Sequence, residues 1–544
     1  MRITLKRIFV LCVASLLVFN AVFLNMTTIN ANEDVETNEE DQDLENEELN
    51  ENEEVEDKNI VVEEEVVIVD EQLQPLTIVE PSTEYTFEEI FTDPILAQYV
   101  AESYFNRTVD STVTQEELDN HNYFYTNSDQ GITDIAGIQY FRNLEYIDLY
   151  DTEIDSLAPI NNLEHLTSLN IRENQNLTSL SGLYNLPALT DIYLQNCSIT
   201  EIGTIDSNIP LRTFTSQDGK LMNIDGLSNI TTLESVDVKN NNLSTIDALI
   251  NKPNLYYVNI ESNKITSLSP LTNSTAVETV YAKGNLITST NGLQNASELR
   301  ELDLSNNKIK DIQALTNITV LMNLNLQNNL IEDVTSLSNL IELNSLYLDN
   351  NKIKNIDGLE NLTNLYELKL HNNDISDLSG FKNSSFSLGS LDVSNNKLTS
   401  LDGIQGFPQL NASNNLLTNV DDIQSCSQLN YVTLHNNNIK EINIQNSLEG
   451  LRFLDLSNNK INDISFLKAF ATSLFDYGDL DLENNEIESL QVLHDIYDAG
   501  DYHNLSSLNI SNNKLTSLSE LSFLSNADTI LGALYVNNNN LTSL

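Results

Sequence analysis

Basic residues are scarce in this 544-residue sequence. It has 26 lysines and arginines against 81 aspartates and glutamates, which gives a formal net charge of −55 at pH 7. An acidic surface of this size repels the phosphates of nucleic acids and the headgroups of anionic lipids. The charge balance therefore excludes nucleic acid as a partner.

Cysteine and histidine are also rare, with three cysteines and six histidines. The histidines are scattered, and neither the His-x-x-x-His nor the Cys-x-x-Cys spacing of a metal site occurs in the sequence. We therefore predict no metal site, no cofactor and no catalytic residue, and we do not expect an enzyme. Cys197 and Cys426 are separated by about ten of the repeats described below, which places them too far apart for an intramolecular disulfide.

Long hydrophobic runs are absent except at the N-terminus. Residues 1–31 combine basic residues, an apolar run from Ile8 and a small residue at Ala31, which is typical of a secretory signal peptide. The alternative is an uncleaved membrane anchor, since the run Ile8–Leu24 is close to spanning length. No second span follows in the sequence, so we expect an exported chain, secreted or at the cell surface, with no membrane span after cleavage. An exported protein of this size without a disulfide framework fits a bacterial exterior.

An acidic segment follows the signal peptide. Residues 32–82 are rich in Glu, Asp and Asn and contain almost no aromatic residue. Such a segment cannot bury enough apolar surface to offset its ordering entropy. We therefore predict a disordered acidic spacer.

Residues 83–143 mix acidic and apolar residues at helical spacing. Asp93 followed by Pro94 indicates one helix start, and Thr114 with Glu117 three residues later forms the pattern of a capping box. We predict two or three short helices that cap one end of the structure that follows.

The rest of the chain, residues 144–544, repeats one pattern. It reads L-x-x-L-x-L-x-x-N-x-L-x-x-L, as in LRELDLSNNKIKDIQAL at residues 299–315. About 18 copies occur, mostly 22 residues apart, and 15 of them have asparagine at the ninth position. This spacing fits neither the stripe of a helix nor the alternation of a strand, and it is the signature of the leucine-rich repeat.

Each letter of the repeat has a structural reason. The segment L-x-L is a short strand with its leucines inward, and the ninth-position asparagine can bond backbone groups of the sharp turn that follows. One repeat cannot bury its apolar face alone, so neighbours stack around a shared core. We expect an α/β solenoid, a curved array with one long parallel β-sheet on the concave face, 3-10 and loop segments on the convex side, short helices in the last repeats and a small helical N-terminal cap. The predicted asparagine ladder comprises Asn241, Asn263, Asn285, Asn307, Asn329, Asn351, Asn373, Asn396, Asn415, Asn437 and Asn459.

Some repeats depart from the pattern. Thr152 and Cys197 replace the ladder asparagine and still offer a polar atom, whereas Gly219 cannot. Because Ser216 also stands where an inward apolar residue belongs, we expect a local weak point or bend in that repeat. The sequence stops on Leu544 within the last repeat, and solenoids need polar caps at both ends. We therefore expect an uncapped C-terminal end and a fragment of a longer protein, the alternative being a genuine end.

The repeats and the preceding segment resemble those of internalins, which are surface-exposed or secreted proteins of Gram-positive bacteria. The resemblance rests on repeats such as NLTNLYELKLHNNDISDLSG and on IFTDPILAQYVAESYFNRTVDSTVTQEELD, which looks like the internalin helical cap. It implies a cap joined to the first repeat and a concave face that binds host cell proteins or related partners. Internalins usually continue into an immunoglobulin-like domain and a wall anchor, and no Leu-Pro-x-Thr-Gly signal occurs in this sequence.

The outward residues of the concave face are the candidates for ligand binding. Exposed tyrosines offer large rigid contact area and a hydroxyl group, and they dominate binding hot spots, although strands also favour tyrosine for packing reasons alone. We predict that Tyr431 and Phe453 share one column of adjacent strands and that Tyr257 and Tyr281 meet on a diagonal. The predicted ligand-binding residues are Tyr257, Tyr281, Lys239, Lys283, Tyr347, Lys369, His371, Tyr431, His435 and Phe453.

The sequence therefore favours an exported, internalin-like adhesin that recognises a protein or glycan ligand without covalent chemistry. Two other hypotheses remain open. The repeats could be the targeting arm of a larger surface enzyme whose catalytic domain lies beyond Leu544, or the chain could be a purely structural surface protein.

Overall fold

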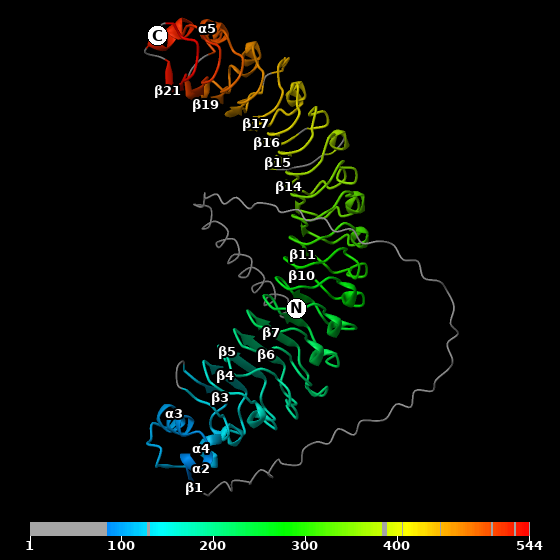
Figure 1. Cartoon of the computed structure of the whole chain (residues 1–544), viewed down its shortest axis with the longest axis vertical. Coiled ribbons are helices and arrows are strands. Elements are labelled where there is room, and N and C mark those ends of the chain that lie inside the picture. The colour runs from blue at the N-terminus through cyan, green and yellow to red at the C-terminus, as the bar shows by residue number, and fades with distance from the viewer. Residues whose placement is uncertain are drawn as a thin grey trace, which may run out of the picture. The chain divides into compact units, whose positions relative to one another are not determined.

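The computed structural model describes residues 84–544 except for 128–130, 383, 385–388, 405, 447, 502–503, 527–528 and 543–544. The predicted signal peptide and acidic spacer lie outside the described residues. The described part is a curved solenoid of stacked coils, with the strands on its inner face (Figure 1).

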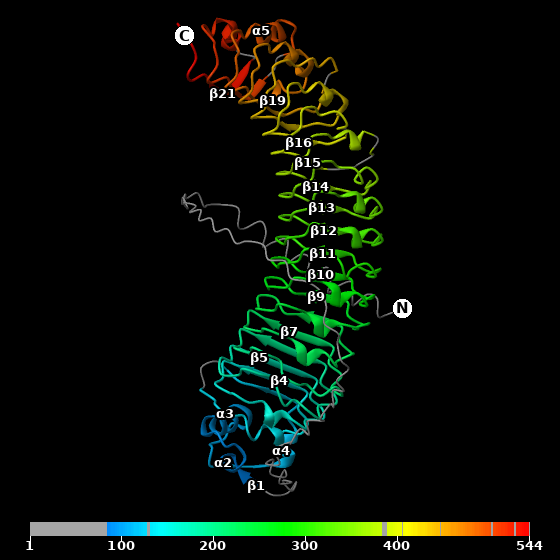
Figure 2. The ribbon, with the colours of Figure 1, turned by 45° about the vertical axis from the view of Figure 1, so that its right-hand side comes forward.

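In the described residues, nineteen strands, β3 to β21, pair in parallel and in chain order (Figures 1 and 2). Each coil contributes one strand, and β4 to β21 lie in the repeat registers, so the predicted parallel sheet is confirmed. The strands are β3 (Tyr123–Tyr125), β4 (Tyr146–Tyr150), β5 (Ser168–Arg172), β6 (Asp191–Gln195), β7 (Thr213–Gln217), β8 (Ser235–Asp237), β9 (Tyr257–Asn259), β10 (Thr279–Tyr281), β11 (Glu301–Asp303), β12 (Asn323–Asn325), β13 (Ser345–Tyr347), β14 (Glu367–Lys369), β15 (Ser390–Asp392), β16 (Gln409–Asn411), β17 (Tyr431–Thr433), β18 (Phe453–Asp455), β19 (Asp476–Asp481), β20 (Asn504–Asn509) and β21 (Ile530–Tyr535).

The segments opposite the sheet are mostly short 3-10 helices, as predicted. They are η1 (Ile138–Tyr140), η2 (Ala158–Ile160), η3 (Asp225–Leu227), η4 (Asp247–Leu249), η5 (Ser269–Leu271), η6 (Gln313–Leu315), η7 (Thr335–Leu337), η8 (Ser379–Phe381), η9 (Asp421–Ser425), η10 (Ser465–Phe470) and η11 (Ser519–Ser525). One α-helix, α5 (Gln491–Asp498), lies in a lengthened repeat near the C-terminal end. Within the described range, no helix is long and apolar enough to cross a membrane.

The leucine positions of each repeat form the core. In the coil of β11, Leu302 and Leu304 point inward from the strand, and Ile309, Ile312 and Leu315 fill the space beneath the returning segment. All five side chains are at most 3% exposed. Burying a side chain of this size stabilises the fold by about 1.5–3 kcal/mol, and neighbouring coils share the same continuous cluster.

The ninth-position asparagine bonds the backbone of two coils. The Asn329 side-chain oxygen accepts from Ile309 N in the preceding coil at 2.9 Å, and Nδ2 donates to Leu304 O of that coil at 3.0 Å. Nδ2 also donates to Leu326 O at 3.0 Å and Gln327 O at 3.3 Å in its own coil. Each of the eleven predicted ladder asparagines bonds both its own coil and the preceding one in this way. The amides thus satisfy buried backbone groups that the turns leave without strand partners.

Two replacements keep a polar atom at the ladder position. The Thr152 hydroxyl donates to the side-chain oxygen of Asn174 in the next coil. The Cys197 thiol lies 3.4 Å from Ile171 O and 3.5 Å from Gln195 O, so its single S–H faces carbonyl oxygens of the same two coils that a ladder asparagine bonds. This contact explains why a buried thiol occupies a hydrogen-bonding position.

The coil that carries Gly219 is regular in its strand pairing. β7 pairs with β6 and β8 without a register shift, and the inward Ser216 is buried. A Cβ at residue 219 would stand 2.8 Å from the side-chain oxygen of Asn241, so the glycine leaves room for the ladder residue of the next coil. The predicted weak point therefore does not disrupt the register of strand pairing in this coil.

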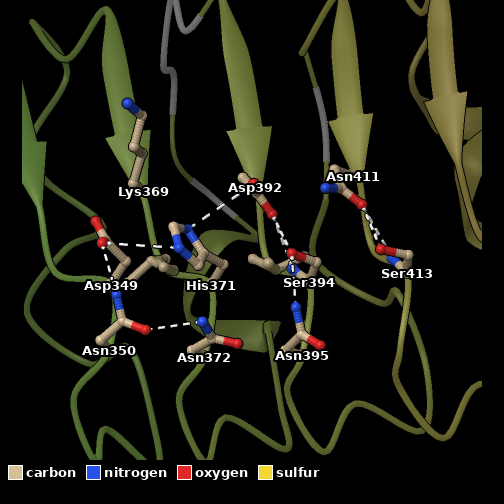
Figure 3. Close-up of polar contacts among 12 residues, drawn as sticks. Asp349, Asn350, Lys369, His371, Asn372, Asp392, Ser394, Asn395, Asn411 and Ser413 are labelled. Atoms are coloured by element: carbon tan, nitrogen blue, oxygen red, sulfur yellow. Dashed lines mark hydrogen bonds and ion pairs between the residues drawn. The ribbon is translucent and has the colours of Figure 1, made fainter. Parts of the chain in front are cut away.

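The eighth position of the repeat has a structural role that was not predicted from the sequence. Asn328 and its counterparts adopt a left-handed backbone conformation, with φ of 57° at Asn328, which asparagine tolerates better than most residues. Their side chains also join neighbouring coils, because Asn372 Nδ2 donates to Asn350 Oδ1 at 2.7 Å (Figure 3). The frequent Asn-Asn doublets therefore combine a turn residue with a ladder residue.

The described part of the N-terminal cap contains three α-helices, α2 (Phe87–Ile90), α3 (Pro94–Phe105) and α4 (Gln115–Asp119). Both predicted helix starts are present. The Asp93 carboxylate accepts from Ile95 N at 2.8 Å, and Thr114 with Glu117 forms a capping box. The helical character of the cap is confirmed.

The cap also contains strands that the sequence did not predict. β1 (Glu84–Thr86) and β2 (Thr112–Thr114) form an antiparallel pair, and β3 extends the main sheet by one strand beyond the first repeat. Tyr104 covers the outer edge of β3, since its hydroxyl accepts from Tyr125 N at 2.6 Å and donates to Tyr125 O at 2.9 Å. The cap thus closes an edge that would otherwise be open to pairing with another chain.

An ion pair in the cap makes its stability depend on pH. The guanidinium of Arg107 lies against Glu117 and, with the N–H of Thr114, lowers the pKa of that carboxyl to about 2. Because the folded pKa lies below the ordinary glutamate pKa of 4.5, the stabilisation is present above about pH 4.5 and is lost as the pH falls through about 2. We expect Glu117→Gln to lower the free energy of unfolding by on the order of 1 kcal/mol at neutral pH, since the pair is partly exposed, and by little near pH 2.

Urea unfolding of the full chain at the two pH values measures this difference. The exposed neighbour Glu116 supplies the matched control, Glu116→Gln. Equal losses at both pH values would contradict the assignment of the stabilisation to the ionised pair.

Candidate functional site

The outward side chains of the sheet are aligned in rows across the coils. Strand pairing places the third-position residue of one coil beside the third-position residue of the next coil. Tyr431 of β17 and Phe453 of β18 are paired in this way. Neighbouring strands lie about 4.8 Å apart. Residues spaced by one repeat in sequence therefore become neighbours on one surface.

Tyr257 and Tyr281 form a tyrosine pair on β9 and β10. Tyr281 pairs in register with Asn259, two residues beyond Tyr257, so the tyrosines meet on the diagonal. Their ring centroids are 6.0 Å apart and the rings are nearly perpendicular. Burial, and to a smaller extent the nearby Asp237 carboxylate, raises the pKa of Tyr257 to about 12. Its hydroxyl therefore remains a hydrogen-bond donor at neutral pH.

Lys239 and Lys283 lie on either side of Glu261, at the seventh positions of three consecutive coils. Burial and the neighbouring Asp303 carboxylate raise the pKa of Glu261, and the two lysines oppose that rise. The tyrosine pair is thus bordered by a row of alternating charge. The structure brings together four predicted residues here.

A central cluster on the coils of β13 and β14 consists of Tyr347, Glu367, Lys369 and His371. The Tyr347 hydroxyl donates to Glu367 Oε2 at 2.6 Å, and the Lys369 ammonium lies 4.9 Å from the centroid of the Tyr347 ring. Lys369 is also 3.1 Å from Glu367 Oε1. Burial, followed by the Glu367 carboxylate, raises the pKa of Tyr347 to about 12. This cluster is held together by its own internal contacts.

His371 contacts residues of the two neighbouring coils at the edge of the central cluster. Its Nε2 lies 3.7 Å from Asp349 Oδ2 and its Nδ1 lies 3.9 Å from Asp392 Oδ2, so the imidazole stands between two carboxylates (Figure 3). The Asp349 side chain is only 5% exposed, whereas that of His371 is 27% exposed. The sequence prediction singled out the histidine but neither of its acidic neighbours.

Tyr431 and Phe453 form the C-terminal aromatic pair. Their ring centroids are 6.3 Å apart with an interplanar angle of 30°, and Tyr431 is 51% exposed. They occupy the same column, as predicted. His435 stands at the seventh position of the Tyr431 coil, ~13 Å further along at strand rise, so it lies at the rim of this pair rather than within it.

A further group of tyrosines was not predicted as a site. Tyr123 of the cap stacks on Tyr125 and on Tyr146 of the first repeat, with centroid distances of 5.4 and 5.1 Å, and we call these residues the N-terminal tyrosine cluster. Beside it, the Arg172 guanidinium lies 5.0 Å from the ring centroid of Tyr150. The prediction missed Tyr123 and Tyr125 because it assigned them to a helical segment. The alternation Tyr-Phe-Tyr ahead of the first repeat was the signal that could have located them.

Many outward acidic and amide side chains have a structural role. At the fifth position, Asp303 Oδ1 accepts from Ser305 N at 2.8 Å, and Asn325 Nδ2 bridges to Asp303 Oδ2 at 3.2 Å. This local cap closes the end of the strand. Where Tyr281 and Tyr347 occupy the fifth position, the coil presents aromatic surface instead of that cap.

The described residues contain no group of three or more His, Cys, Asp or Glu side chains arranged to hold a metal ion. Cys197 and Cys426 are both buried free thiols, and burial raises the pKa of each. These thiols therefore belong to the core of the repeats and not to the outward surface.

The fold and the repeat define a leucine-rich repeat protein. The family described as Leucine Rich repeats (2 copies) matches residues 341–383. No curated protein matches the chain. Among solved structures, the internalin InlF from Listeria monocytogenes is 30% identical, and the match covers 59% of this chain and 100% of that one with a TM-score of 0.43.

Two further structures share the fold. InlJ, also from Listeria monocytogenes, is 21% identical, covers 76% of this chain and 83% of that one, and has a TM-score of 0.51. A structure of the Toll–Spatzle complex from Drosophila is 20% identical, covers 77% of this chain and 57% of that one, and has a TM-score of 0.55. By its repeat and its cap, the chain is an internalin-like leucine-rich repeat protein.

Proposed function

We propose that this chain is an exported bacterial protein that binds a protein ligand, without covalent chemistry, on the concave face of its solenoid. The observation that carries the proposal is the set of aromatic groups on that face. The tyrosine pair, the central cluster and the C-terminal aromatic pair all project from the outward side of one sheet, and Tyr431 exposes half of its surface.

The spacing of these groups supports a protein ligand. Tyr281 and Tyr347 are three strands apart, about 14 Å, and Tyr347 and Tyr431 are four strands apart, about 19 Å. A surface of separated aromatic anchors with charged borders is typical of protein–protein interfaces. The Toll–Spatzle complex, which shares the fold, is an assembly of a protein with a protein ligand. Export rests on the signal-peptide pattern of residues 1–31.

A capture experiment tests the proposal. The chain without residues 1–31 is immobilised and exposed to extracts of animal-cell and bacterial-surface proteins. The same is done with two concave variants, Tyr257→Ala/Tyr281→Ala and Tyr431→Ala/Phe453→Ala. We expect a protein that the parent chain retains and that at least one concave variant loses.

The control is Tyr366→Ala. Tyr366 is 71% exposed but stands at the second position of its repeat, outside the outward rows of the sheet. Its loss should leave retention unchanged. If every retained protein binds the parent, the concave variants and the control alike, the concave face is not the binding surface.

A further inference from the structure

Carboxylates lie beside Phe453 of the C-terminal aromatic pair. Phe453 pairs in register with Asp479 of β19, and Asp455 of β18 pairs with Asp481. Tyr431, Phe453 and Asp479 therefore form one row of three adjacent strands, with Asp455 in the next row. We call Tyr431, Phe453, Asp455 and Asp479 the C-terminal patch.

The acidic residues around this patch differ in how many of their carboxylate oxygens accept hydrogen bonds. Asp481 Oδ1 accepts from Glu483 N at 2.9 Å, and Asn509 Nδ2 bridges Asp481 Oδ2 and Glu483 Oε2 at 3.2 and 3.1 Å. Asp455 uses Oδ1 to accept from Ser457 N at 2.9 Å. Asp481 and Glu483 are thus tied to the scaffold, whereas Asp455 has its second carboxylate oxygen available for a ligand.

Among the described residues, no lysine or arginine forms an ion pair with Asp455, Asp479 or Asp481. Burial raises the pKa of Asp481, and the carboxylates of Asp455 and Glu483 add to the rise. The nearest basic residue in the sequence, Arg452, lies beside the row and pairs with Asp476 Oδ2 at 3.2 Å. A cation that binds near these carboxylates would relieve their mutual repulsion.

The charge of the outward rows changes along the sheet. From the first repeat to Lys369, four basic residues stand among the acidic ones, namely Arg172, Lys239, Lys283 and Lys369. In the described coils beyond Lys369, the third, fifth and seventh positions carry five acidic residues and no lysine or arginine. The C-terminal third of the face therefore differs in charge from the rest.

We propose that the C-terminal patch binds an arginine-rich segment of the partner protein. A guanidinium lies on the face of the Tyr431 and Phe453 rings and pairs with the carboxylates of Asp455 and Asp479. Arginine fits both surfaces, because its planar group stacks on aromatic rings and donates two parallel hydrogen bonds to a carboxylate. The inference rests on the proposed function of the concave face and adds the chemistry of its ligand.

A defined peptide tests the proposal without knowledge of the natural partner. The probe is a fluorescein-labelled decapeptide of alternating Arg and Ser, and its control has Gln in place of Arg. Binding to the full chain is followed by fluorescence anisotropy at 0.15 M salt. We expect the arginine peptide to bind and the glutamine peptide to show no measurable binding.

Charge-only variants locate the site. Asp455→Asn keeps the strand cap, since Asn325 and Asn411 make the same bond to the backbone two residues on. We expect Asp455→Asn/Asp479→Asn to weaken binding at least tenfold. The pair Glu298→Gln/Asp498→Asn removes the same charge from side chains that are 57% and 66% exposed and stand outside the outward rows, and it should change binding less than twofold.

The aromatic contribution is tested in parallel. Tyr431→Ala is expected to weaken peptide binding at least fivefold, and Tyr366→Ala less than twofold. Circular dichroism and thermal unfolding establish that each variant retains the fold.

Three results would overturn the inference. These are no binding of the arginine peptide, equal weakening by the two charge pairs, and equal effects of the two tyrosine substitutions. Equal weakening would mean that the probe responds to the overall charge of the chain. These results are distinct from a failure of the proposed function, since a protein captured by the concave face would still be lost from the concave variants.

Discussion

Replacement of Asn329 by alanine is expected to lower the free energy of unfolding by about 3–5 kcal/mol. The Asn329 amide makes four hydrogen bonds to buried backbone groups, one accepted from Ile309 N and three donated to carbonyl oxygens of two coils. Each buried polar group left without a partner costs about 1–3 kcal/mol. Urea unfolding followed by circular dichroism measures the loss.

Two further variants separate hydrogen bonding from other effects. Asn329→Asp keeps the size and one acceptor but cannot donate to the carbonyl of Leu304, so it should lose at least as much stability as alanine. Asn323→Ala changes an exposed residue of the same coil and should stay within about 0.5 kcal/mol of the parent. If Asn329→Ala costs no more than Asn323→Ala, the ladder does not stabilise the solenoid.

Replacement of Gly292 by alanine is expected to cost about 4 kcal/mol or more. Gly292 has a φ of +112°, which side chains with a Cβ rarely adopt, and a Cβ there would stand 2.0 Å from the carbonyl oxygen of Leu268 in the preceding coil. Backbone cannot yield as a flexible side chain does, so the two coils must separate locally. Steric strain of this kind belongs to the small group of strongly destabilising substitutions.

Gly182 offers a matched control for Gly292. It has a φ of +89°, but a Cβ there would meet no atom within 4 Å. Gly182→Ala should therefore cost only the backbone strain, about 1–2 kcal/mol. Urea unfolding of both variants isolates the contribution of the contact between coils, and equal losses would contradict the close packing of Gly292 on Leu268.

The features that the sequence predicted are those that each repeat specifies by itself. Leu302 and Leu304 must point inward because a single coil has only one apolar side, and Asn307 must satisfy the same turn in every copy. The pairing of Tyr431 with Phe453 followed from the regular repeat length, because equal steps place equal positions on neighbouring strands.

The features that the sequence did not predict depend on contacts between coils. β3 has only three residues and directly follows a segment with helical spacing, and it exists because β4 pairs with it and Tyr104 covers its other edge. The close packing of Gly292 depends on a carbonyl of the preceding coil. The position of His371 between Asp349 and Asp392 depends on side-chain conformations in three coils, which residue spacing does not specify.

The central claim is that the partner binds the outward face of the sheet. The most direct test is the dissociation constant of the captured protein for Tyr431→Ala/Phe453→Ala and for Tyr366→Ala, each compared with the parent chain. Loss of two hot-spot aromatic side chains is expected to weaken binding by about 2–4 kcal/mol, on the order of 30- to 1,000-fold, while Tyr366→Ala leaves the constant unchanged. If the concave variant and the control bind the partner as tightly as the parent does, the claim is contradicted.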